Sequence, residues 1–425
     1  MKLESYWLHT APPFEGARAG PVVDKADIVV IGGGLTGLSA ALALAKRGAS
    51  VVVLEAGRIG GEASGRNGGM CNNGLAIDFV GAVERYGAAT ARALHLAYDL
   101  AVDTVERIIR EENIACDFKR TGKLKLASKP NHFDKLARTH DALAAAAADE
   151  TLLIPRSEIR SEIGSDRYFG GIVYPKSAGM HVGRFTHGLA AAARRRGAQV
   201  YVDAPVAKLR RVRGYEHDVT TARGTVRARQ VLLATGVSAR GPFARYRRRI
   251  VPVGSFIIVT EPLSHRLVDE LMPTRRMATD TKNVGSYFRI TPDSRLLFGG
   301  RARFAMSNPR SDAKSGRILE QTMLSVFPQL RGTRLDYCWG GLVDMTADRL
   351  PRAGEHDGLF YSMGYSGHGT QMSTHMGVVM AEVMDGRPEA NIWRSFEWPA
   401  IPGHFGRPWF LPIVGAYYRL MDVLH

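Results

Sequence analysis

Three glycines and one glutamate near the start of the chain have the types and spacing needed to hold a dinucleotide. Gly32, Gly34 and Gly37 form a G-x-G-x-x-G pattern directly after the mostly β-branched run Asp27–Ile31. Such glycines allow a tight turn, close approach of the backbone to a pyrophosphate, and close packing of a helix on a strand. Glu55 follows a second apolar run, where a carboxylate accepts hydrogen bonds from both hydroxyls of a ribose.

A strand, a helix and a second strand must position these residues. The run before Gly32 has the pattern of a parallel strand buried on both faces, and an alanine- and leucine-rich helix follows the glycines. The N-terminus of that helix presents unpaired N–H groups to phosphates. Gly48 ends the helix, and residues 51–54 form the second strand. The pattern predicts NAD or FAD binding, and a glycine-rich turn in another α/β protein is the less favoured alternative.

The composition describes an ordinary globular protein with a strong basic charge. The 425 residues are 45% hydrophobic and suggest two or three domains, while the net charge of +16 favours anionic partners. We favour a solvated, arginine-rich surface over RNA binding, because the arginine clusters lack interleaved aromatic residues and no RNA-binding module is present. We therefore expect no nucleic-acid partner.

Cysteine use and hydropathy predict a cytoplasmic protein. Cys71, Cys116 and Cys338 are too few and too scattered for a disulfide framework or a zinc site, which fits a reducing compartment and predicts no metal. Residues 1–26 lack the apolar segment of a signal peptide, and no apolar run approaches the roughly 20 residues that span a membrane.

Segments typical of a nucleotide-binding fold recur along the chain, separated by mainly β-patterned stretches. One of them is the strand 230–233, which ends in the turn Ala234, Thr235 and Gly236. This interleaving predicts an α/β fold with α+β insertions, in which a Rossmann-like domain alternates with a mainly antiparallel β substrate domain. The predicted Rossmann-like FAD-binding domain comprises residues 21–80, 151–244 and 336–390, and the substrate domain comprises residues 81–150 and 245–335.

Both ends of the chain lie outside these domains. Residues 1–20, with aromatic side chains around a Pro-Pro pair, predict an extended arm laid on the body of the protein. Residues 391–425 form a tail that ends in a short amphipathic helix. We favour a helix docked on its own domain, and a helix lying on a membrane surface is the alternative.

Five sequence blocks together resemble one enzyme family. The chain is similar to flavoprotein amine oxidoreductases of the D-amino-acid oxidase superfamily, and within it resembles the gamma-glutamylputrescine oxidoreductase group. The blocks are SYW, VVIGGGLTGLSAALALAKRG with VVVLEAGRIG, ASGRNGG, YFRITPDSRLLFGG, and WGGLVDMTADRLPRAG with GYSGHGTQ. They span nearly the whole chain, and ASGRNGG and GYSGHGTQ are the most specific.

The resemblance implies FAD, with adenosine near Glu55 and the flavin ring between ASGRNGG and the loop that begins at Gly364. That loop opens a helix whose N-terminus would stabilise the negative charge of reduced flavin. The residues that the resemblance assigns to FAD are Gly32, Gly34, Leu35, Thr36, Gly37, Glu55, Ala56, Arg58, Ser64, Gly65, Arg66, Asn67, Gly68, Gly69, Val206, Ala234, Thr235, Gly236, Gly364, Gly367, His368, Gly369, Thr370 and Gln371. Relatives that tether FAD use a cysteine ahead of the T-x-D block, and GGLVDM has none, so we expect non-covalent FAD.

The implied reaction is oxidation of an amine, such as a gamma-glutamyl-polyamine, by hydride transfer to flavin N5. The imine then hydrolyses to a carbonyl compound and an amine, and O₂ is reduced to H₂O₂. The alternative is a D-amino-acid or imino-acid dehydrogenase that passes electrons to a quinone or another acceptor. The partners are thus a small amine and an electron acceptor.

Three side chains are candidates for work beside the ring. Tyr287 and Arg289 are two residues apart and share one face of a strand. Arg289 would clamp a substrate carboxylate, unless it lies on a solvated face or pairs with Asp293. His368 would stabilise the reduced flavin, unless only its backbone matters.

Overall fold

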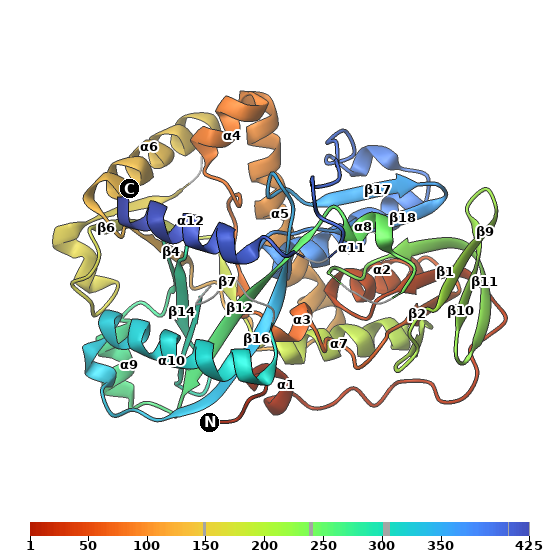
Figure 1. The fold of residues 1–425 in the computed structure, drawn as a ribbon, viewed down its shortest axis with the longest axis horizontal. Helices are drawn as coiled ribbons and strands as arrows, with labels where there is room; N and C mark the ends of the chain where they lie inside the picture. Colours follow the sequence, from red (N-terminus) through yellow and green to blue (C-terminus); the bar gives the residue numbers. More distant parts are fainter. Residues whose placement is uncertain (148–149, 238–240, 301–306, 407, 425) are drawn as a thin grey trace.

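The computed structural model describes residues 1–147, 150–237, 241–300, 307–406 and 408–424. Within these residues the strands form two 8-stranded sheets and one 2-stranded sheet. Figure 1 shows the two large sheets on opposite sides of the molecule, with the sheet that contains β1 on the right. The fold is therefore mixed α/β, as the sequence predicts.

The first sheet is built around β1. Its strands are, in spatial order, β17 (Arg352–His356), β18 (Leu359–Met363), β11 (Gly224–Leu233), β1 (Lys25–Ile31), β2 (Val51–Leu54) and β8 (Gln199–Tyr201), with β10 (Glu216–Thr221) and β9 (Lys208–Arg213) continuing from β11. β1 pairs in parallel with both β11 and β2. Ile28 and Val30 pack into one apolar cluster, whereas Val29 and Ile31 pack into another. Both faces of β1 are buried, which explains its continuous apolar run.

Three helices cover one face of this sheet. They are α2 (Leu35–Ala45), α7 (Val182–Arg195) and α11 (Gly369–Met384), and α2 packs against both of the others. The contact between α2 and α11 is close, because a Cβ on Gly377 would lie 1.9 Å from Ser39 Oγ. This packing brings the N-termini of α2 and α11, which are far apart in sequence, to the same edge of the sheet.

The second sheet is antiparallel except for one pair. Its strands are β16 (Leu335–Met345), β12 (Val251–Thr260), β15 (Leu296–Gly300), β14 (Ser286–Ile290), β13 (Met277–Asp280), β4 (Lys123–Leu126), β6 (Gly170–Tyr174) and β5 (Leu152–Pro155), of which β13 and β4 are parallel. Phe256 and Ile258 pack with α9 (His265–Leu271) and α10 (Pro309–Val326). Ile257 and Val259 point the other way, into the cluster that contains α2. One apolar core therefore joins the two sheets.

Strand pairing differs from the ranges predicted for the two domains. β5 and β6 fall within the predicted nucleotide-binding range 151–244, and β16 begins the range 336–390, yet all three pair in the second sheet. β16 pairs along β12 from Leu335 to Met345, and this long ladder fixes its place. The division of the chain into two domains stays a prediction. The alanine-rich segment after β4 forms α6 (Pro130–Ala147).

Two further helices, α4 (Phe79–Tyr86) and α5 (Ala88–Glu112), pack against each other, and both also contact α6. Gly87 separates them, with a φ of 80°. α5 also contacts α11, so the helical layer of the first sheet continues above the second sheet, as Figure 1 shows. Among the described helices, none is both long and apolar enough to cross a bilayer.

The two ends of the chain are docked on the body. α1 (Tyr6–Thr10) brings Trp7, which is fully buried, against the segment after α3 (Ala63–Arg66). At the other end, α12 (Leu411–Leu424) lies across the second sheet in Figure 1, and Leu411 packs against Val253. The Asp422 carboxylate accepts hydrogen bonds from the backbone N–H groups of residues 283 and 284. The C-terminal helix is thus docked on its own sheet.

Candidate active site

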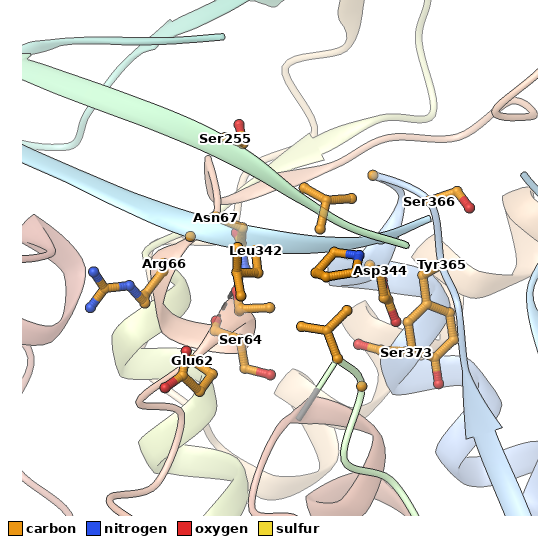
Figure 2. Close-up of a pocket in the computed structure, with 18 of the residues that line it drawn as sticks. Glu62, Ser64, Arg66, Asn67, Ser255, Leu342, Asp344, Tyr365, Ser366 and Ser373 are labelled. Atoms are coloured by element: carbon orange, nitrogen blue, oxygen red, sulfur yellow. Dashed lines mark hydrogen bonds between the residues drawn. The ribbon is translucent and has the colours of Figure 1, made fainter. Parts of the chain in front are cut away.

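A cavity of about 1690 Å³ runs from the glycine turn after β1 to the inner face of the second sheet. Pockets for one small ligand typically have about 300–1,000 Å³, so this cavity has room for a dinucleotide and a second molecule. Figure 2 shows Glu62, Ser64 and Asn67 along one side, and Asp344 and Tyr365 along the other. The two sides come from segments that the fold joins across its two sheets.

Glu55 closes the nucleotide end of the cavity. Its Oε2 accepts a hydrogen bond from Gly33 N–H at 2.7 Å, and its Oε1 accepts one from Gly57 N–H at 2.8 Å. Burial raises the pKa of the Glu55 carboxyl, and these N–H donors oppose that shift. Beside it, Gly32 has a φ of 116°, and a Cβ there would lie 2.5 Å from Ala234 O. Only glycine allows this close passage of the two turns.

Two helix N-termini open onto the cavity. α2 has Gly34 as its N-cap and α11 has His368, and neither N-cap residue supplies a side-chain cap. At α2, the Leu35 N–H instead donates to Ser64 Oγ at 3.0 Å. Helix N-termini attract anions through their unpaired N–H groups and dipole. The cavity therefore offers two anion-stabilising ends, from α2 and α11.

The segment 64–69 runs along one wall and is held from both sides. Asn67 Oδ1 accepts a hydrogen bond from Gly69 N–H at 2.8 Å and one from Thr370 Oγ at 3.3 Å. Trp7 Nε1 donates to Asn67 O at 2.7 Å, and Trp339 Nε1 donates to the backbone oxygen of residue 66 at 2.9 Å. Two buried indoles thus fix the carbonyl groups of this loop.

Tyr287 lies on the wall that the second sheet provides. The strand register aligns it with Thr279 on β13 and, one strand further, with Lys125 on β4. All three line the cavity. The Tyr287 hydroxyl lies 3.0 Å from Ser255 Oγ, and a Cβ on Gly68 would approach the Tyr287 ring to 3.0 Å. A hydroxyl-rich row therefore faces the loop across the cavity.

Arg289 shares the face of Tyr287 but is not brought to the cavity. Its guanidinium donates to the backbone oxygens of Gly69 and, at 3.1 Å, Met180. Among the described residues it pairs with no acid, and burial lowers its pKa to about 10. Asp293 pairs with Arg295 instead. The alternative in which Arg289 pairs with Asp293 is therefore not formed among the described residues. Arg289 supports the loop from behind, and its role as a substrate clamp stays a prediction.

Two half-buried side chains lie beside the start of α11. The His368 ring lines the cavity and packs edge-on against Tyr98, with ring centroids 5.6 Å apart. Asp344 accepts a hydrogen bond from Gly364 N–H at 2.6 Å, and burial raises the pKa of its carboxyl to about 6. Gln371 is turned away from the cavity and donates to Asn72 O. The loop before α11 is thus anchored by an acid that the sequence did not single out.

Most of the residues assigned to FAD from the sequence line this one cavity, together with Tyr287 and His368. Those that lie behind the wall are Gly37, Gly65, Gly69, Arg289, Gly364 and Gln371. The wall residues that sequence reasoning missed include Lys123, Lys125, Ser255, Thr279, Asp280, Asp344, Arg349, Tyr365 and Ser373. For Lys123 and Lys125 a signal existed, because the alternating strand TGKLKLA places both lysines on one face.

The residues present fit a flavin dinucleotide. The glycine cradle at Gly32, the carboxylate of Glu55 and the two helix N-termini match a ribose, a pyrophosphate and an electron-rich ring edge along one cavity. Within the described residues, no group of three or more His, Cys, Asp or Glu side chains is arranged to hold a metal ion.

Comparison with known proteins gives a consistent picture. Residues 27–383 match the family model described as DAO, FAD dependent oxidoreductase. Gamma-glutamylputrescine oxidoreductase of Escherichia coli is 34% identical over 94% of this chain and 93% of its own length. A probable oxidoreductase, OrdL, of Haemophilus influenzae is 32% identical, also over 94% of this chain and 93% of its own length.

Among solved structures, glycine oxidase from Geobacillus kaustophilus superposes with a TM-score of 0.73 and 22% identity, covering 90% of this chain and all of that one. This likeness concerns the fold. With the family match and the two relatives it leads to one conclusion: the chain belongs to the DAO family of FAD-dependent oxidoreductases and is an enzyme.

Proposed function

We propose that the protein oxidises the C–N bond of an amine, with non-covalently bound FAD as the immediate electron acceptor. The observation that carries this proposal is the continuity of one cavity from Glu55, past the N-termini of α2 and α11, to Tyr287. A dinucleotide and a small substrate can meet in such a space. The similarity to gamma-glutamylputrescine oxidoreductase supports an amine as the substrate.

FAD supplies the hydride acceptor that amino-acid side chains lack. Gly32, Gly34 and the first turn of α2 would hold its pyrophosphate, and Glu55 would accept hydrogen bonds from the adenosine ribose. The N–H groups at the start of α11 would stabilise negative charge on the ring. Each of these roles is binding or electrostatic, and none requires a side chain to react.

At the substrate end, the chain orients the amine and excludes water. In the reaction, a hydride leaves the carbon next to nitrogen and a proton leaves the nitrogen, which gives an imine. Water hydrolyses the imine to a carbonyl compound and an amine, and O₂ takes up two electrons and two protons to give H₂O₂. Tyr287, Ser255 and Thr279 line the wall where a neutral amine would be held, so positioning replaces a dedicated base.

The cysteines support non-covalent binding. Cys71, Cys116 and Cys338 are buried, and none of them is on the cavity wall. Burial raises the pKa of all three thiols, those of Cys116 and Cys338 to about 12, so none is a ready thiolate nucleophile.

An anaerobic reduction experiment tests the function. The purified holoenzyme is mixed without oxygen with polyamines, γ-glutamyl-polyamines, N-methyl amino acids and D-amino acids, and the visible flavin absorbance is followed. We expect an amine to bleach the flavin, and air to restore the colour with stoichiometric H₂O₂. Bleaching by D-amino acids alone, with slow recovery in air and fast recovery with a soluble quinone, would replace the proposal with a dehydrogenase.

A further inference from the structure

Two positively charged side chains face the cavity without a counter-ion. Lys125 on β4 and Arg349 in the turn after β16 both line it. Within the described part of the chain, neither side chain forms an ion pair or a hydrogen bond. Burial lowers the pKa of the Lys125 ammonium; the carboxylate of the exposed Asp78 opposes this shift, and the positive charge of Arg349 adds to it, because the two cations repel each other.

The neighbouring lysine shows the difference. Lys123 shares a face of β4 with Lys125, but its Nζ donates to Asn73 O at 2.7 Å and lies 4.4 Å from the centroid of the Tyr174 ring. The ammonium group of Lys123 therefore already has partners within the protein. Lys125 is half-buried and has no such partners among the described residues, and desolvation lowers its pKa. A partly desolvated, unpaired ammonium costs free energy that an anionic ligand group would offset.

Arg349 is held toward the cavity by an unusual turn. Its φ of 62° lies in the left-handed region, which non-glycine residues adopt infrequently. The adjacent acid cannot neutralise it, because Asp348 pairs with Arg352 and accepts a hydrogen bond from Leu350 N–H at 3.2 Å. The turn thus separates the arginine from the acid that precedes it.

Three of the four acids of the cavity wall hold backbone N–H groups, and the fourth, Glu62, is exposed. Asp280 accepts a hydrogen bond from Lys282 N–H at 3.2 Å, and its charged neighbours are Lys282 and Asp422. Burial raises the pKa of the Asp280 carboxyl to about 6. Asp344 holds Gly364, and Glu55 holds the glycine turn at the far end. In the described part of the chain, none of these acids forms an ion pair with Lys125 or Arg349.

The sheet also sets the distance between this charge and Tyr287. Lys125 pairs with Thr279, which pairs with Tyr287, so two strand spacings separate the first residue from the last. Strands lie about 4.8 Å apart, which places the backbones of Lys125 and Tyr287 about 10 Å from each other. An α-amino acid held beside the Tyr287 side chain is too short to reach the Lys125 side chain across these two strand spacings.

We infer that Lys125 and Arg349 form an anion subsite that binds a substrate carboxylate remote from the oxidised C–N bond. The substrate class is then an amine whose carboxylate lies several bonds from the reacting carbon, in preference to an α-amino acid or an uncharged amine. This inference rests on the proposed amine oxidation, and it assigns specificity to β4 and to the turn after β16.

Binding of glutarate to the holoenzyme tests the subsite without turnover. The dissociation constant is measured from the change in flavin absorbance for Lys125→Met, Arg349→Met, the charge-preserving Lys125→Arg, and Lys208→Met, an exposed lysine on β9 away from the cavity. We expect glutarate affinity to fall about 10- to 100-fold in each of the first two variants, the loss typical of one charge-assisted contact. Lys125→Arg should restore most of it, and Lys208→Met should match the wild type.

Turnover supplies the second readout. The ratio of kcat/KM for 6-aminohexanoate to that for hexylamine should fall about 10- to 100-fold in Lys125→Met and in Arg349→Met, whichever of them folds with its flavin. An unchanged glutarate affinity, or equal losses for both amines, would overturn the inference. If no amine reduces the flavin, the proposed function fails, and the glutarate measurement still decides on the subsite.

Discussion

The ring of Tyr287 packs on Gly299 of the neighbouring strand, where a Cβ would come within 2.3 Å of the ring. A Cβ on Gly68 would approach the same ring, at Cε2, to 3.0 Å. Two glycines thus leave a slot for one aromatic side chain between the sheet and the cofactor loop. The position of the Tyr287 ring depends on the absence of a Cβ atom at Gly68 and Gly299.

Gly299→Ala should therefore displace the Tyr287 ring into the cavity. We expect kcat/KM for the amine substrate to fall at least about tenfold while FAD stays bound, since a misplaced reacting geometry costs much of the advantage of orientation. Steady-state kinetics measure the effect. In a Tyr287→Ala background the same substitution should cost little more, because the clash is gone; additive losses would disprove the slot.

Arg289→Met should destabilise the protein without changing its choice of substrate. The substitution leaves the carbonyl of Met180 without its guanidinium donor, at about 1–3 kcal/mol, whereas the carbonyl of Gly69 keeps the hydrogen bond from Met180 N–H and loses less. Urea unfolding should show the loss, and Arg289→Lys should recover part of it. The kcat/KM ratio of carboxylated to uncharged amines should stay constant; a selective loss for the carboxylated amine would return Arg289 to the role of clamp.

Glu55→Arg should release FAD. The substitution removes the acceptor for the ribose hydroxyls and the two contacts that shape the glycine turn. We expect a rise of at least about 100-fold in the dissociation constant of FAD, measured by flavin fluorescence during reconstitution. Glu62→Arg, at the exposed rim of the same cavity, is the matched control and should keep its flavin.

Asp344→Asn should change how stability depends on pH. Burial raises the pKa of the Asp344 carboxyl from 3.8 to about 6 in the folded protein. Between these values the folded state holds a proton that the unfolded state has released, so wild-type stability falls as pH rises through this window. The amide does not ionise, so it contributes no such fall in the stability of the variant as pH rises. Relative to wild type, the variant should gain stability between pH 4 and pH 7, by at most about 3 kcal/mol.

The comparison is best made by urea unfolding of the flavin-free proteins at both pH values. A difference between variant and wild type that is the same at pH 4 and pH 7 would show that Asp344 titrates normally.

Acid precipitation of the holoenzyme should leave all of the FAD in the supernatant. The buried cysteines away from the cavity wall give no attachment point. Flavin absorbance of the pellet and the supernatant measures the partition. Colour that stays with the washed polypeptide would contradict non-covalent binding.

Local patterns predict the strand, the glycine turn and the first helix of the β1 sheet, and these elements are present. The strand, glycine turn, helix and Glu55 are neighbours in sequence, so their geometry follows from short-range rules. Strand alternation also placed Tyr287 and Arg289 on one face. It did not reveal that the loop after α3 covers Arg289 and leaves Tyr287 open, because that depends on contacts more than 200 residues apart.

The other end of the cavity is harder to predict for the same reason. Lys125 belongs to a short alternating strand that places Lys123 and Lys125 on one face, and what that face meets depends on the pairing with β13. Arg349 lies in a turn whose left-handed backbone is not encoded by a glycine. Likewise, the sequence assigns most of β16 to the nucleotide-binding range, whereas the structure pairs this strand with β12 in the second sheet.

The N-terminal arm has a consequence for biosynthesis. Ser5 Oγ donates to Gly65 O, Trp7 reaches Asn67, and the backbone of Lys2 pairs with residues 336–338. Residues 2–7 and the loop 64–69 thus contact a strand that lies more than 250 residues further along the chain, and contacts so distant in sequence form late. The loop 64–69 receives the support of Trp339 only after β16 has been synthesised. This wall of the cavity is therefore completed late in folding.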